Sequence, residues 1–140
     1  MFPIAGYTYT TPPAAIRQMT VGLDASGMVS AVVGRGVKDR SGAIVAAIVL
    51  SQYNPKLTVL LNKRTVGQVL AGAVKGANAF APGKDTVTSR VLSGNQVRLF
   101  QTASVSMAMA YKPGGKLIEV MGPAPGPVLG VTAAYLAADQ

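Results

Sequence analysis

Histidine, cysteine and tryptophan are absent from this 140-residue sequence, and the first two absences exclude much of enzyme chemistry. Without them the chain has no zinc-finger spacing, no Ser-His-Asp or Cys-His nucleophile and no thiol redox centre. The sequence also contains no Ser-x-x-Lys and no Gly-x-Ser-x-Gly motif. Its 5 carboxylates lie far apart in the sequence. We therefore expect no catalytic residue, no metal and no cofactor, and a protein that is not an enzyme.

Long hydrophobic runs are missing as well, although 49% of the residues are apolar and the mean hydropathy is +0.36. The most apolar segment, 43–50, is far shorter than the roughly 20 residues needed to cross a bilayer. The N-terminus has neither the charged nor the apolar region of a signal peptide. We expect no transmembrane span and no signal peptide in this chain. The apolar excess instead indicates a sheet buried on both faces or an oligomer interface.

Positive charge dominates, since 13 Lys and Arg residues against 5 Asp and Glu residues give a net charge of +8. This balance is compatible with binding to nucleic acid or another polyanion. However, the sequence has no run of basic residues and no aromatic residues interleaved with them, as a base-stacking surface requires. A shell of solvated basic side chains is therefore favoured, and nucleic-acid binding stays open as the less favoured alternative.

One short segment predicts a site for a small anion. Lys63 and Arg64 directly precede a helix that Thr65 is expected to cap, so two cations lie beside free backbone N–H groups. We take Lys63, Arg64 and Thr65 as a candidate anion-binding site. The alternative is that both cations are simply solvated.

Residue patterns along the chain predict alternating helical and extended segments. A helix is expected after Pro12 and Pro13, another after Thr65, where Thr65 and Gln68 match a capping box, and a last one from Pro127. Residues 57–61 fit either a short strand or a helical turn, and residues 80–85 are expected to form a loop. Strands are expected at 28–38, 43–52, 86–92, 96–101, 104–111 and 116–121.

These elements predict a single α+β domain over residues 1–140. We expect one antiparallel sheet of about five or six strands, with three helices packed on one face, in the order α-β-β-α-β-β-β-β-α. The strands after residue 85 are expected to form hairpins with one face in water. On one of them Met107, Met109 and Tyr111 alternate with small residues. This stripe fits core packing, or alternatively an adaptable apolar groove or interface, which flexible Met side chains suit.

A further interpretation comes from the segments 3–9, 12–13, 32–49, 53–55, 91–97 and 117–123. Together these segments span most of the chain, and they resemble small uncharacterised α+β domains of actinobacteria. In those domains a similar opening follows a membrane anchor, so the resemblance implies a location facing the cell envelope and implies no catalytic residue. We expect no such anchor in this chain, so a cytoplasmic location stays open.

Taken together, the composition favours a non-enzymatic binding or accessory domain that acts through protein–protein contacts, as a subunit of a larger complex or a homo-oligomer. One alternative is a self-assembling shell or filament protein, built through exposed sheet edges. Two further alternatives are a basic polyanion-binding protein and a pocket for an apolar ligand.

Overall fold

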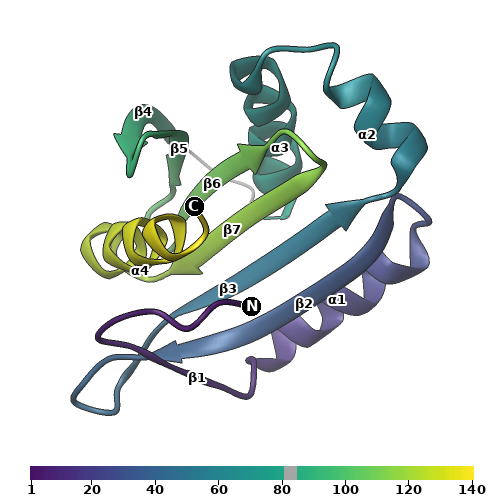
Figure 1. The fold of residues 1–140 in the computed structure, drawn as a ribbon. Coiled ribbons are helices and arrows are strands. Elements are labelled where there is room, and N and C mark those ends of the chain that lie inside the picture. The colour runs from purple at the N-terminus through teal and green to yellow at the C-terminus, as the bar shows by residue number, and fades with distance from the viewer. Residues whose placement is uncertain (81–84) are drawn as a thin grey trace.

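A long hairpin forms one half of the sheet. Strands β2 (Val29–Lys38) and β3 (Ile44–Tyr53) are antiparallel. They are joined by a turn in which the Asp39 carboxylate accepts hydrogen bonds from the Ser41 and Ala43 N–H groups at 2.9 and 3.2 Å. Gly42 has a φ of +85°, a conformation that favours glycine. The computed structural model describes residues 1–80 and 85–140. The hairpin forms where the sequence predicts its two strands (Figure 1).

The other strands complete a 7-stranded sheet in the order β1-β2-β3-β7-β6-β5-β4, with every neighbouring pair antiparallel. The last strand in the chain, β7, returns to pair with β3 and so joins the two halves. The sheet has one strand more than the upper expectation, because the short β1 carries no alternating apolar pattern. The additional strands are β1 (Thr8–Thr10), β4 (Thr86–Leu92), β5 (Asn95–Gln101), β6 (Ser106–Lys112) and β7 (Lys116–Gly122).

Helices cover both faces of the sheet, so the expectation that they share one face is wrong. Helices α1 (Ala14–Ala25) and α3 (Val66–Phe80) pack on one face, and α4 (Pro125–Ala138) packs on the other (Figure 1). The physical reason is that the central strands are apolar on both sides. Six of the seven residues of β6 are buried, and a strand of that kind needs cover above and below. Consequently β6 and β7 do not have the water-facing side that alternation suggested, whereas almost all of β4 is exposed.

A fourth helix, α2 (Pro55–Leu61), occupies the segment that the sequence left undecided. Asn54 caps it, because its side-chain oxygen accepts a hydrogen bond from the Leu57 N–H at 2.8 Å, and Pro55 begins the first turn. The predicted capping box of α3 is confirmed by reciprocal hydrogen bonds between Thr65 and Gln68 at 2.9 and 3.1 Å. In the loop expected at 80–85, positions 81–84 lie outside the described residues.

The core divides into two layers, one on each side of the sheet. On the α4 face, Tyr135 and Leu136 pack on Ile48 and Ile118, and all four are fully buried. On the α1/α3 face, Leu70 packs with Phe100 and the methionines of β6. Across residues 1–80 and 85–140, no helix is long and apolar enough to span a membrane.

Candidate functional site

A pocket of about 190 Å³ lies between α1 and α3, against the face of the sheet that these two helices cover. Side chains of α1 form one wall, the small residues of α3 form the other, and β6 and β7 form the floor. We call this the inter-helix pocket. Its lining residues are Met19, Leu23, Gly76, Ala77, Met107, Leu117 and Glu119.

Glu119 is the one ionisable residue in that lining, and its side chain is almost fully buried. Glu119 lies on β7, which pairs with β3 on one side and β6 on the other. The residues directly opposite it are Val49 of β3 and Met109 of β6, and both are 0% exposed. Among the described residues no hydrogen bond or ion pair reaches its carboxylate. Burial therefore raises the pKa of Glu119 from 4.5 to about 7, because an apolar surrounding disfavours the charged form.

Two tyrosines border this part of the sheet. Burial, and then the nearby charge of Glu119, raise the pKa of Tyr53 to about 12. The Tyr111 hydroxyl donates a hydrogen bond to Asn62 Oδ1 at 3.0 Å, which ties β6 to the end of α2. Neither tyrosine donates a hydrogen bond to Glu119 in the described structure, so the carboxylate is an acceptor without a donor.

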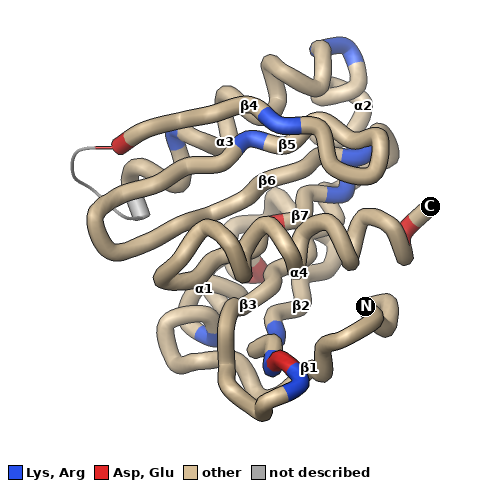
Figure 2. Tube along the Cα trace, turned by 90° about the vertical axis from the view of Figure 1, so that its left-hand side faces the viewer, with Lys and Arg blue, Asp and Glu red and all other residues tan. Residues whose placement is uncertain are grey.

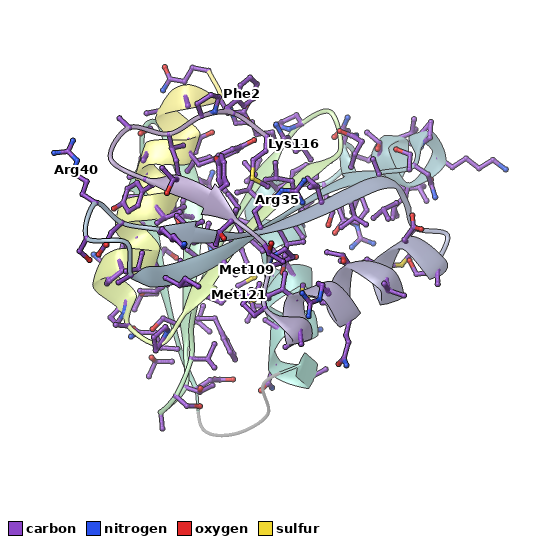
Figure 3. The ribbon with its side chains drawn as sticks, turned by 90° about the horizontal axis from the view of Figure 1, so that it is seen from below. Phe2, Arg35, Arg40, Met109, Lys116 and Met121 are labelled. Carbon is purple, nitrogen blue, oxygen red and sulfur yellow. The ribbon has the colours of Figure 1, made fainter. Side chains whose placement is uncertain are left out.

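The predicted stripe of Met107, Met109 and Tyr111 lies inside the domain. These side chains are 1%, 0% and 4% exposed, respectively, beneath the helices of the α1/α3 face. Figure 3 labels Met109 and Met121, which both belong to the core layer on the α1/α3 face of the sheet. Met107 lines the inter-helix pocket, so for this residue the groove interpretation stays a prediction. An interface role for the stripe would require a helix to move away.

The predicted anion site places Lys63, Arg64 and Thr65 together at the start of α3, and all three residues are exposed. Several of the backbone donors there already have partners. The Thr65 N–H donates to Gln68, and the Lys63 and Arg64 N–H groups donate to the carbonyls of α2. An anion would thus be held mainly by the two cationic side chains, and the site remains a prediction.

Sequence reasoning missed that β4 is the outer strand of the sheet. It pairs with β5 on one side, and among the described residues nothing pairs with its other side. All of its residues except Leu92 are exposed, and Val87 and Val91 are 45% and 71% exposed. Five of the seven residues of β4 are β-branched or carry a hydroxyl group, which predicts a strand, but only the topology could place that strand at an edge.

A second apolar hollow, of about 350 Å³, lies where the start of α1 meets the ends of β3 and β7. Ile44 stands at its rim and is 58% exposed. Ser104 is the only polar side chain among its described lining residues, so the hollow offers little to orient a ligand.

Basic residues are distributed over many elements rather than gathered on one face (Figure 2). Some of them have partners within the fold. Lys116 Nζ lies 2.8 Å from the Asp139 carboxylate, at the end of α4, and 5.2 Å from the centre of the Phe2 ring (Figure 3). Lys112 is 3.7 Å from the same carboxylate. These contacts leave fewer basic side chains for a polyanion.

No protein-family model matches the sequence, and comparison with curated proteins and with solved structures finds no similar protein. The resemblance to actinobacterial envelope domains therefore stays a prediction.

Proposed function

We propose that this chain is a non-enzymatic protein-binding domain that acts through the free edge of β4, and that its partner there is a second copy of the same chain. The observation that carries the proposal is the exposure of Thr86–Leu92 along an edge without a neighbouring strand. Every second residue of such an edge directs its N–H and C=O groups outward. A second strand would satisfy these groups by extending the sheet.

The two edges of the sheet differ in how well they are protected. The edge formed by β1 has three residues, and short edge strands offer little to an incoming strand. The β4 strand has seven residues in unbroken register with β5. It contains no proline, lysine or bulge, the devices that usually block pairing between edges. The β4 edge is therefore the better template.

The sequence of β4 favours a second copy because it is self-complementary about Ser89. In an antiparallel pair centred on Ser89, Val87 lies opposite Val91 of the second copy, and Thr88 lies opposite Arg90. Directly opposite pairs of β-branched side chains stabilise a β-ladder, and the two-fold symmetry produces the Val87–Val91 pair twice. Arg90, the single charged residue of the strand, is not placed directly opposite its own copy.

Pairing of two β4 edges gives a closed dimer, because each copy uses the same edge. A two-fold axis uses the same edge in both copies, which leaves only the short β1 edges free. It therefore favours a dimer, alone or within a larger complex, over the filament that exposed edges first suggested. A location facing the cell envelope would be compatible with it and remains the prediction of the resemblance.

Disulfide trapping tests the register, because the chain has no native cysteine. With Ser89→Cys, the two cysteines lie directly opposite each other, with Cα atoms about 4.5–5.5 Å apart, which is within the span of a disulfide. With Thr88→Cys they lie on a diagonal of about 7–8 Å and should not be bridged. Ser41→Cys, in the exposed turn after β2, controls for random collision.

We expect rapid oxidation to a covalent dimer for Ser89→Cys alone. Equal rates for all three variants would overturn the proposal. So would a native dimer in which Ser89→Cys fails to cross-link, because a different surface would then form the contact.

A further inference from the structure

We propose that the inter-helix pocket binds a small organic amine, with its apolar group between α1 and α3 and its ammonium group paired with the Glu119 carboxylate. The proposal is independent of the β4 edge, and the two sites share no residue.

The first observation is a buried carboxylate that faces a cavity. Glu119 is 7% exposed and lines the pocket, among side chains that are otherwise apolar. A buried carboxylate without a partner costs stability, and this cost would be removed by a cation placed beside it. An ammonium group supplies both the opposite charge and up to three hydrogen-bond donors.

The fold does not supply that cation from its own described residues. Arg98 lies in the same row across the sheet, but Met109 stands between it and Glu119 in the register, and no ion pair joins them. A metal ion is a poorer candidate, because residues 1–80 and 85–140 contain no group of His, Cys, Asp or Glu that could hold one. One carboxylate suits a single positive charge.

The second observation is the size and lining of the pocket. Its volume of about 190 Å³ is slightly larger than the roughly 150 Å³ apolar cavities that take up benzene. One small ring or a short aliphatic chain would fill it. The thioethers of Met19 and Met107 are polarizable and adapt to the shape of such a group.

Helix α3 borders the pocket with small residues, and this leaves room for a ligand. A Cβ atom added at Gly76 would meet nothing within 4 Å, so a larger side chain there can be accommodated and would extend over the pocket. Gly72 lies one turn earlier on the same helix, is equally open, and is not part of the lining. The two glycines therefore form a matched pair for a blocking experiment.

The experiment titrates the full-length chain with benzylamine at pH 8, using isothermal calorimetry and backbone amide chemical shifts, with benzyl alcohol as the neutral analogue. We expect benzylamine to bind with shifts centred on Ala77, Met107 and Glu119. Benzyl alcohol should bind about tenfold more weakly or not at all, and Glu119→Gln should remove this preference. Gly76→Leu should abolish binding, whereas Gly72→Leu should leave it unchanged.

Three results would overturn the proposal. One is that benzylamine fails to bind the wild-type chain at millimolar concentration. Another is that it binds Glu119→Gln as well as it binds the wild type, since the carboxylate would then not recognise the amine. The third is that Gly76→Leu binds as well as Gly72→Leu, which would place the ligand outside the pocket. Amide spectra of each variant show whether it is folded.

Discussion

Val87 of β4 lies directly opposite Phe100 of β5 in the sheet, yet Phe100 is fully buried and Val87 is 45% exposed. On the α1/α3 face, the buried part of the sheet therefore extends as far as Phe100 on β5 and does not include Val87 on β4. The strand beyond that boundary keeps an apolar surface and an unpaired edge. This is the arrangement on which the proposed dimer rests.

The exposed valines provide a direct test of the interface. Val91→Lys places a charge on the β4 edge and should convert the dimer to a monomer, because an edge lysine opposes strand pairing. Val21→Lys on α1 is the matched control, since the two valines are 71% and 69% exposed. Both variants should stay within about 0.5 kcal/mol of the wild type in monomer stability. Sedimentation equilibrium should give a monomer mass for Val91→Lys and a dimer mass for Val21→Lys. Dissociation of both variants alike would contradict this interface.

The buried carboxylate makes stability depend on pH. Its folded pKa of about 7 lies above its ordinary value of 4.5, so the folded state binds more protons than the unfolded state between these values. Stability should therefore fall as the pH rises from about 4 to about 8, by roughly 3 kcal/mol from this group. Glu119→Gln should lack this component. Urea unfolding of both chains across that range measures it, and parallel pH profiles would contradict the burial of an unpartnered Glu119.

Asp139, at the end of α4, forms ion pairs with Lys112 of β6 and Lys116 of β7, and these ion pairs connect the helix to the sheet. Asp139→Asn removes the charge of a carboxylate that is 14% exposed, and we expect a loss of about 1 kcal/mol in unfolding free energy. Asp24→Asn, at an exposed position on α1, should change it by less than about 0.5 kcal/mol. Thermal unfolding of the two variants gives the comparison; equal losses would mean that the ion pairs do not hold the helix.

Asn54 joins two local structures. Its side-chain oxygen caps α2, and its side-chain amide donates to the Gly27 carbonyl at 2.8 Å, before β2 begins. Asn54→Ala should cost about 1 kcal/mol, typical of a lost N-cap, and the second hydrogen bond adds to this. Asn54→Asp should retain the cap. Urea denaturation with unchanged midpoints for Asn54→Ala would show that α2 does not depend on this side chain.

The parts of the fold that the sequence predicts correctly are governed by neighbouring residues. The Asp39 turn and the Thr65–Gln68 capping box are examples, because each depends on contacts over two to four positions. The pairing of β7 with β3 joins segments far apart in the chain, and local patterns carry no information about it. The apolar composition does indicate a sheet buried on both faces, but the sequence does not show which helix covers which face, and the expectation of helices on one face was wrong for that reason.

The candidate sites likewise combine a feature that the local sequence shows with a placement that depends on contacts between distant segments. Glu119 stands alone as a charge between Ile118 and Val120, a signal in the sequence that a carboxylate would be drawn into the core. Its position beneath two helices required the fold. The β4 edge likewise became recognisable only once the order of the strands was established.

The most direct test of dimerisation through β4 is the mass of the purified wild-type chain in solution, measured by light scattering over a range of concentrations. Pairing through β4 predicts a mass of twice the 14.3 kDa of one chain, with dissociation on dilution and in Val91→Lys. A mass of 14.3 kDa at every concentration would contradict the dimer.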